Sequence, residues 1–219
     1  MGRMKPAPQD PTLAPWMSLQ ERLAGYLAAR VRGLLASDFV LSGREGEELG
    51  RLHVYGRRGA DLEAGIITAA IERGAGSRYT MLDSDGRVIL EETAGSGDVS
   101  EVRRGDRVYE VRLALLRNAA VVRSSGGAEV ARVAGGLTNR SYEAFFDAGE
   151  EGALPLAVFL LYCIIALRRG AFLMGTERGD ASSAKGSNVP EKERLCTKIR
   201  TTEGSRTTRR AGPTPPAAR

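Results

Sequence analysis

The feature that most constrains this fold is an apolar run in the last third of the chain, Leu156-Ala-Val-Phe-Leu-Leu-Tyr-Cys-Ile-Ile-Ala-Leu167. Pro155 stands in the first turn, where its missing N–H costs nothing, and Arg168, Arg169 and Gly170 follow as a helix stop. The pattern therefore predicts a helix. Because this helix has no polar face, either protein or lipid must surround it.

The length of the run separates these two environments. A helix over residues 153–167 spans about 22 Å, whereas the hydrocarbon core of a bilayer is about 30 Å thick and needs about 20 apolar residues. Extending the span to Met174 would place Arg168 and Arg169 in the membrane, which is costly. We therefore predict a central helix at 153–169 that is buried in protein. The alternative is a membrane protein anchored by a single helix over 153–174, with a small cytoplasmic β-domain.

The region before this helix has the texture of many short strands. From Asp38 onward, runs of Val, Ile, Leu, Tyr and Thr are interrupted by Gly, Asp and Ser, and about nine or ten strands are predicted. Asp85-Gly86 suits a tight hairpin turn, and Val108 to Leu115 alternates as a half-buried strand does. The predicted strands cover residues 39–41, 51–55, 65–72, 78–82, 87–92, 107–115, 118–123, 129–134 and 141–145.

The N-terminal segment divides into an arm and a helix. Residues 1–16 are rich in proline, which fixes φ and removes backbone donors, so a flexible arm is predicted. Ser18 and Glu21 have the spacing of a capping box, and apolar residues then recur at threes and fours. These signals predict an amphipathic helix over 17–35. Its basic residues leave two interpretations open, packing on the domain or a partner and lying on a membrane surface.

The net charge of +5 belongs to the C-terminal tail. Residues 1–175 contain 22 Lys and Arg against 22 Asp and Glu, whereas residues 176–219 contain 10 against 5. The neutral domain has no overall field to attract polyanions, so no specific nucleic-acid binding is expected. The tail over 175–219 is polar and basic and is predicted to be disordered.

The two cysteines indicate the compartment. Cys163 lies in the apolar run and Cys196 in the polar tail, so a disulfide framework is not expected and a reducing compartment is favoured. The N-terminal residues contain no apolar h-region of a secretory signal. We therefore expect a cytoplasmic protein, with a peripheral position at the inner face of the membrane as an option.

Residues that could support catalysis or hold a metal are sparse. His53 is the single histidine, and no zinc-ligand spacing or nucleophile elbow accompanies it. The glycine clusters fit no phosphate-binding or dinucleotide-binding spacing. We therefore expect no enzymatic activity, no catalytic residue, no metal and no cofactor.

Two arginine groups are the candidate ligand-binding residues. Arg57 and Arg58 lie between glycines, and Arg103, Arg104 and Arg107 surround Gly105. Both groups fall in predicted turns, and together they could clamp phosphate groups of lipid headgroups through bidentate hydrogen bonds. Acidic neighbours lie close in the sequence, so ordinary solvated loops are the competing interpretation.

The order of elements resembles a known family. A series of hairpins near the form Tyr-x-Met-Leu-Asp-x-Asp-Gly-Arg-x-Ile-Leu precedes an acidic loop and one apolar C-terminal helix. This order resembles the tubby C-terminal-like superfamily, which includes tubby, the LURP-one-related proteins and the phospholipid scramblases. The resemblance covers about residues 38–172 and rests on Tyr79 to Glu92, Arg107 to Ala134 and Leu154 to Leu167.

The resemblance implies a mainly β fold, a closed antiparallel barrel of about twelve strands around the apolar helix, over residues 38–174. It implies no single function, because the members of the family differ in what they do. Tubby binds phosphoinositides and scramblases are linked to lipid movement, but the scramblase calcium segment and palmitoylated cysteines are not seen in this sequence. We therefore expect a non-enzymatic binding domain for phospholipid headgroups, an anionic membrane surface or a protein partner.

Overall fold

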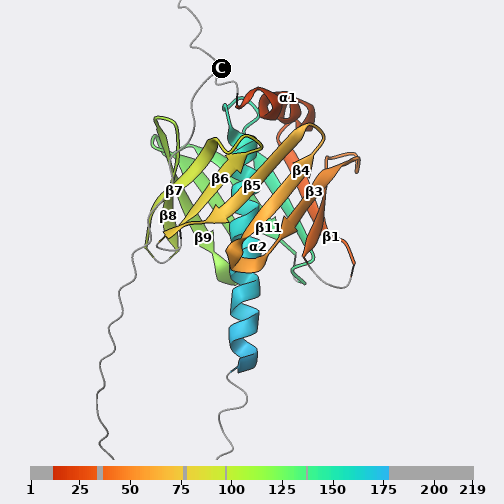
Figure 1. The fold of residues 1–219 in the computed structure, drawn as a ribbon, viewed down its shortest axis with the longest axis vertical. Helices are drawn as coiled ribbons and strands as arrows, with labels where there is room; N and C mark the ends of the chain where they lie inside the picture. The colour runs from red at the N-terminus through yellow and green to blue at the C-terminus, as the bar shows by residue number, and fades with distance from the viewer. Residues whose placement is uncertain (1–11, 34–36, 76–77, 97, 137, 178–219) are drawn as a thin grey trace, which may run out of the picture. The chain divides into compact units, whose positions relative to one another are not determined.

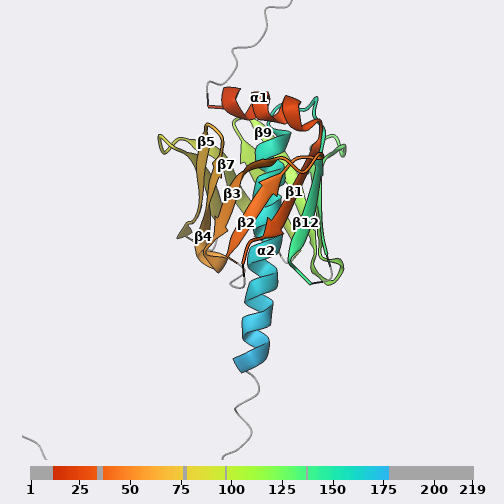
Figure 2. The same cartoon turned by 90° about the vertical axis from the view of Figure 1, so that its right-hand side faces the viewer.

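Twelve strands close into one antiparallel barrel, and helix α2, Ala153–Glu177, runs through it, as a computed structural model of the chain shows (Figures 1 and 2). The structure describes residues 12–33, 37–75, 78–96, 98–136 and 138–177. The predicted fold class is confirmed. The strands are β1 Tyr26–Val31, β2 Asp38–Ser42, β3 Glu48–Val54, β4 Gly59–Ala64, β5 Ile67–Arg73, β6 Tyr79–Asp83, β7 Val88–Ser96, β8 Val99–Arg104, β9 Arg107–Ala114, β10 Ala119–Ser124, β11 Glu129–Gly135 and β12 Ser141–Phe146.

Each strand pairs with its neighbours in sequence, and β1 pairs with β12 to close the sheet. In such an up-and-down barrel, successive loops lie at alternate ends, and closure leaves no exposed sheet edge. We call the end where α2 begins the capped end and the end where α2 leaves the barrel the exit end. The exit end holds the β1–β2, β3–β4, β5–β6, β7–β8, β9–β10 and β11–β12 loops.

The core is the contact between α2 and the inner faces of the strands. Every residue of α2 from Ala153 to Ala166 is buried. Inward-facing strand positions are often small, as at Ala69, Ala120 and Ala144. They leave room for a helix about 10–12 Å wide. Complete burial of each large apolar side chain contributes about 1.5–3 kcal/mol, which explains why the helix can lack a polar face. The prediction of burial in protein is confirmed.

The barrel also bears on the membrane-anchor alternative. Residues 153–166, which that alternative places in lipid, are enclosed by strands. No helix within the described stretches is both long enough and apolar enough to cross a bilayer. The predicted helix stop at Gly170 was wrong, because the helical backbone continues to Glu177. Glycine in a helix costs about 1 kcal/mol but ends it only by adopting a left-handed conformation.

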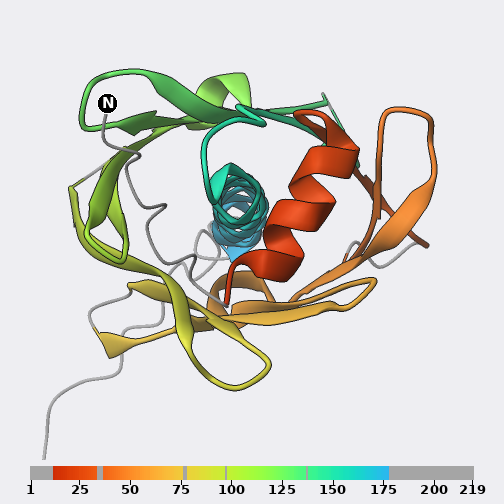
Figure 3. The same ribbon diagram turned by 90° about the horizontal axis from the view of Figure 1, so that it is seen from above.

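Helix α1, Ala14–Leu23, lies across the capped end beside the start of α2 (Figure 3). It buries Leu13, Trp16 and Leu23 in the same core as α2. Gln20 is fully buried and joins the two helices. Its Nε2 donates to the carbonyl oxygens of Ala148 (3.0 Å) and Glu150 (2.8 Å), and its Oε1 accepts from the Leu154 N–H (3.0 Å). The first turn of α2 is therefore held by a side chain of α1.

The predicted helix over 17–35 was wrong at both ends. Helix α1 starts before the Ser18 capping box, with Pro15 in its first turn, where proline is favoured. It stops early because Ala24 and Gly25 have positive φ of 46° and 83°. A Cβ at Gly25 would lie 2.7 Å from the Phe146 carbonyl oxygen, so the break needs glycine. The apolar residues that follow belong to β1, and residues 34–35 of the predicted helix lie outside the described residues.

Two further strands, β4 and β8, were missed because their sequences carry weak strand signals. The inward positions of β4 are alanines and one leucine, Ala60, Leu62 and Ala64, and alanine is depleted in strands. In β8 the inward residues are Val102 and the charged Arg104. The predicted arm over 1–16 is helical from Ala14, and residues 1–11 lie outside the described residues. The predicted tail over 175–219 is helical to Glu177 and lies outside them from 178.

Candidate functional site

Basic residues gather in the loops of the exit end. We call them the exit-end arginines: Arg32, Arg57, Arg58, Arg78, Arg117 and Arg140. All are exposed. Among the described residues of the same loops, Asp98 is the one acidic side chain. Because alternate loops of an up-and-down barrel meet at one end, residues far apart in sequence form a single basic face.

The arginines of this face make no ion pair in the described part of the chain, although Asp61 and Glu72 line the same surface hollow as Arg58. Arg140 donates from Nη2 to the Gly33 carbonyl oxygen at 3.2 Å, a neutral acceptor. A guanidinium without a carboxylate partner keeps both its charge and its planar set of donors for an external anion.

Arg57 and Arg58 lie on a turn that the core holds in place. They belong to the 3-10 helix η1, Gly56–Arg58. The Tyr162 hydroxyl of α2 donates to the Gly56 carbonyl oxygen at 3.3 Å, and the Tyr79 hydroxyl donates to that of Arg57 at 3.2 Å. Burial raises the pKa of Tyr162, which therefore stays a donor at neutral pH. The backbone is fixed while both guanidinium groups face solvent.

The β9–β10 connection is fixed in a similar way. Asn118 is buried with a φ of 51°, and its Nδ2 donates to the Gly136 carbonyl oxygen and to the Asn139 side chain, both at 3.0 Å. Arg168, at the point where α2 leaves the barrel, donates from Nε to Asn118 Oδ1 at 3.3 Å. Beside this network, Leu116 is 100% exposed. The exit end therefore combines basic residues with a fully exposed leucine.

The capped end has the opposite character. Its loops contain acidic residues, namely Glu45, Glu47, Asp85, Asp106, Asp147, Glu150 and Glu151. Several arginines near this end have carboxylate partners, whereas Arg44 lies over the Tyr26 ring. Arg87 contacts Asp85 at 3.1 Å, Arg103 contacts Glu91 at 3.0 Å, and Arg107 contacts Glu150 at 2.5 Å. Their charges are largely used within the protein.

Glu150 gathers a small polar cluster above the start of α2. Its Oε1 accepts from Arg107 Nη1 (2.5 Å) and from the Tyr109 hydroxyl (3.1 Å). The hydrogen bond with Tyr109, and then the Glu150 carboxylate, raise the pKa of Arg107. Tyr109 itself is buried. The cluster fixes the loop that leads into α2 rather than offering charge to a ligand.

Arg104 is the most enclosed arginine of the capped end, with only 9% of its surface exposed. Its Nη2 lies 3.8 Å from Glu151, and its Nε and Nη1 have no hydrogen-bond partner among the described residues. The guanidinium packs against Gly152, where a Cβ would lie 2.2 Å from Nη1. This arginine is part of the interior and not of a binding surface.

The predicted phosphate clamp does not assemble. Arg57 and Arg58 lie at the exit end, whereas Arg103, Arg104 and Arg107 lie at the capped end, so the two groups do not converge on one ligand. The reason is the topology of the barrel, because the β3–β4 loop lies at the exit end and the β8–β9 loop lies at the capped end. Arg117, Arg140 and Leu116 were not among the predicted site residues. Assigning successive loops to alternate ends of the barrel would have found them, because every second loop is basic.

The structure also places the residues that were considered for metal binding and reactivity. No His, Cys, Asp and Glu side chains among them gather closely enough to hold a metal ion. Burial raises the pKa of the Cys163 thiol, which keeps it protonated and unreactive. His53 contacts Asp38 on the outer wall.

Among known proteins, one solved structure is similar to this chain, and the sequence comparisons find no match. No protein-family model matches this chain, and no curated protein matches it. Among solved structures, the chain is similar to the X-ray structure of a protein from Arabidopsis thaliana. The sequence identity is 15% and the TM-score is 0.46, over 63% of this chain and 89% of that chain. These values are too low to carry an inference about family or function.

Proposed function

We propose that this protein is a non-enzymatic module whose exit end binds an anionic membrane surface. One observation carries the proposal, namely the gathering at this end of arginines that have no carboxylate partner among the described residues. Near an anionic leaflet each such residue contributes about 1 kcal/mol. A face with this many free guanidinium groups therefore has enough attraction to hold the barrel at a surface.

Two further features support the same orientation. Leu116 is fully exposed among the arginines, and an apolar side chain can enter the boundary between headgroups and acyl chains. Helix α2 also continues past the barrel from this end (Figures 1 and 2). The sequence after α2, residues 178–219, again has more basic than acidic residues. The proposal sets the protein on the cytoplasmic side, where leaflets carry anionic lipid.

The family assignment is part of the proposal. A closed barrel around an apolar helix is the architecture that the resemblance to the tubby C-terminal-like superfamily implies. We regard the chain as a divergent member that shares lipid contact in general terms. No phosphoinositide-binding residue of tubby is carried over to this sequence.

The experiment is co-sedimentation with vesicles. The whole protein is mixed with vesicles of equal parts phosphatidylcholine and phosphatidylserine, or of phosphatidylcholine alone, at low and high salt. Binding is expected only to the anionic vesicles and is expected to weaken with salt, because screening shortens the range of surface charge. Replacing Arg57 and Arg58 by Gln removes about 2 kcal/mol, which corresponds to about a thirtyfold loss of affinity.

A matched variant at the capped end provides the control. Arg44→Gln with Arg87→Gln removes the same charge from the other end of the barrel and should leave vesicle binding within about twofold. Equal losses in both variants would mean that net charge alone acts, without a dedicated face. Absence of binding to anionic vesicles would direct attention to a protein partner instead.

A further inference from the structure

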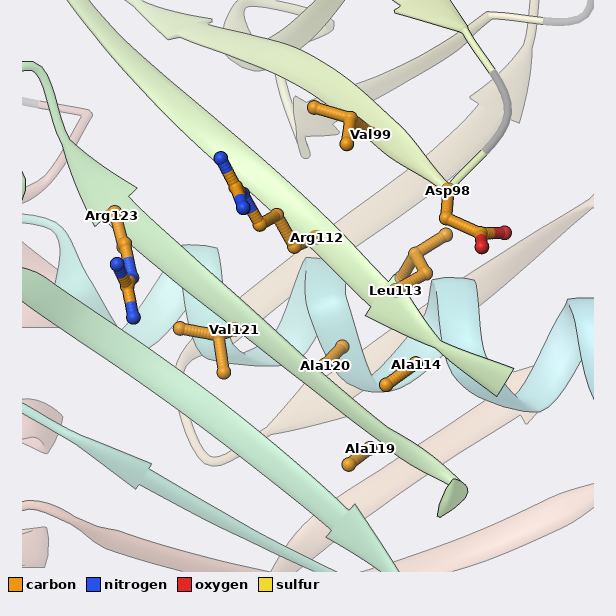
Figure 4. Close-up of a pocket in the computed structure, with 9 residues that line it drawn as sticks. All are labelled: Asp98, Val99, Arg112, Leu113, Ala114, Ala119, Ala120, Val121 and Arg123. Carbon is orange, nitrogen blue, oxygen red and sulfur yellow. The ribbon is translucent and has the colours of Figure 1, made fainter. Parts of the chain in front are cut away.

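The outer wall of β8, β9 and β10 contains a hollow of about 320 Å³ (Figure 4). Its lining is mostly apolar and includes Val99, Leu113, Ala114, Ala119 and Val121. Pockets for small ligands usually measure about 300–1,000 Å³, so the hollow lies at the lower end of that range. It has room for on the order of ten water-sized groups.

The register of the strands explains the hollow. Ala114 and Ala119 are paired directly across β9 and β10, and the next outward pair is Arg112 with Val121. Two methyl groups thus stand where the neighbouring positions carry longer side chains. Val99, which pairs with Arg112 on the other side, is 39% exposed and forms one wall. The floor is therefore low, apolar and open to solvent.

Two arginines stand at the same side of this floor, Arg112 and Arg123 (Figure 4). Arg112 uses its Nε on Glu110 at 2.5 Å, which leaves its two Nη groups free to donate to another acceptor. Arg123 has no ion-pair partner among the described residues. Glu101 and Glu110 on the same wall balance the two positive charges. Recognition here rests on directed N–H donors rather than on net charge.

The hollow adjoins the exit end, because Ala114 and Ala119 flank the connection that carries Leu116. From the exit end toward the capped end, the wall presents first the exposed leucine, then the apolar floor and then the two arginines. Asp98 lies at the lower edge of the hollow and disfavours a second anionic group there. A ligand that fits this order has one alkyl chain and one anionic head.

We infer that this hollow binds a single-chain anionic amphiphile, with its alkyl chain on the Ala114–Ala119 floor and its head accepting hydrogen bonds from Arg112 and Arg123. A fatty acid carboxylate and an alkyl phosphate share this chemistry. The inference rests on the proposed function only for the source of the ligand, which is the adjacent membrane. Binding needs both the charge-assisted hydrogen bonds to the head and the contact of the alkyl chain with the apolar floor.

The test uses the whole protein and dodecanoate or dodecyl phosphate below micelle-forming concentration. Binding is followed by isothermal titration and by NMR shifts of the Ala, Val and Leu methyl groups of the hollow. Acetate and ethyl phosphate provide the heads without the chain, and dodecyltrimethylammonium provides the chain with the opposite head. Only the long anionic compounds are expected to shift these methyl groups. A preference between the two heads identifies whether the hollow suits a carboxylate or a phosphate.

Substitutions separate the chain from the head. Ala119→Phe fills the floor and should reduce affinity at least about tenfold, whereas Ala70→Phe, on the outer face of β5, should not. Arg112→Gln with Arg123→Gln should reduce affinity about tenfold for the anionic compounds and leave any weak binding of dodecanol unchanged. Equal binding by Ala119→Phe, or equal binding of acetate and dodecanoate, would overturn the inference.

The two proposals can fail separately. Ala119→Phe should still bind anionic vesicles through the exit-end arginines, and the Arg57→Gln, Arg58→Gln variant should still bind dodecanoate. Amphiphile binding should also vary little with salt, because the local charges are balanced, whereas vesicle binding falls steeply. Loss of dodecanoate binding in the Arg57 and Arg58 variant would show that the hollow is not an independent site.

Discussion

The capped end and the exit end of this barrel are built from the same strands but hold their charges differently. At the capped end, α1 covers the start of α2, Gln20 bridges the helices, and arginines such as Arg107 are paired with carboxylates. At the exit end, the described loops present arginines without carboxylate partners beside a fully exposed Leu116. One end is arranged to stabilise the fold, and the other is free to meet a partner.

An up-and-down barrel can keep the residues that stabilise the fold apart from the residues that bind a partner. Because loops alternate between the ends, each end can acquire its own charge while the wall and the core stay unchanged. The core then depends on α2, whose buried part extends from one end to the other. Substitutions in the core should therefore cause a severe loss of stability. Substitutions at the capped end should cause a moderate loss, and substitutions at the exit end a small one.

The largest loss of stability is expected when leucine is replaced by aspartate in the buried helix, and the same replacement at the exit end is the comparison. Leu160 is fully buried in the barrel, so Leu160→Asp places an unpaired carboxylate in an apolar interior and should prevent stable folding. Leu116→Asp, at a fully exposed position, should change stability by less than about 0.5 kcal/mol. Circular dichroism with thermal unfolding measures both. A folded, stable Leu160→Asp protein would mean that α2 is not enclosed by strands.

The next effect compares the side chains that hold the two ends of α2. Gln20→Ala removes three hydrogen bonds from a fully buried site and should cost about 3 kcal/mol. Arg168→Ala removes one longer hydrogen bond to Asn118 from a half-buried site and should cost less than about 1 kcal/mol. Urea denaturation gives both values. If the two losses were equal, the exit end would be held as firmly as the capped end.

An effect of about the same size tests the packing of Arg104 against the start of α2. Gly152 and Gly86 have nearly equal positive φ, 78° and 77°, but only a Cβ at Gly152 would meet another group, the Arg104 guanidinium. Gly86→Ala should cost about 1 kcal/mol from backbone strain alone. Gly152→Ala should cost about 3 kcal/mol, because strain and overpacking add. Equal costs in urea denaturation would show that the guanidinium moves aside freely.

Much of this architecture could be predicted from the sequence, because its strongest signals are local or self-consistent. The absence of a polar face on residues 156–167 required enclosure, and a closed sheet provides it. Strand β1 was not predicted, because Leu27 and Val31 continue the helical spacing of apolar residues that begins in α1. Only the positive φ at Ala24 and Gly25 ends the helix. Short strands with small inward residues, such as β4, leave too little pattern to detect.

The candidate site could be predicted only in part, because it depends on which loops meet. Arg57 and Arg58 were chosen as a local pair, and the structure places them in an exposed turn at the exit end. Their supposed partners near Gly105 lie at the other end. Arg117 and Arg140 carry no local motif, and their relation to Arg57 exists only once the strands alternate around a closed sheet.

The exit end, and not the capped end, is proposed to meet the membrane. Two proteins that each carry one accessible cysteine distinguish the two ends, Leu116→Cys at the exit end and Ile66→Cys, 85% exposed in the native protein, at the capped end. Both carry Cys196→Ser, since Cys163 is buried, and both are labelled with a polarity-sensitive dye. On addition of phosphatidylserine vesicles, the dye at position 116 should shift to the blue while the dye at position 66 stays unchanged. A shift at position 66 alone, or equal shifts at both positions, would contradict this account.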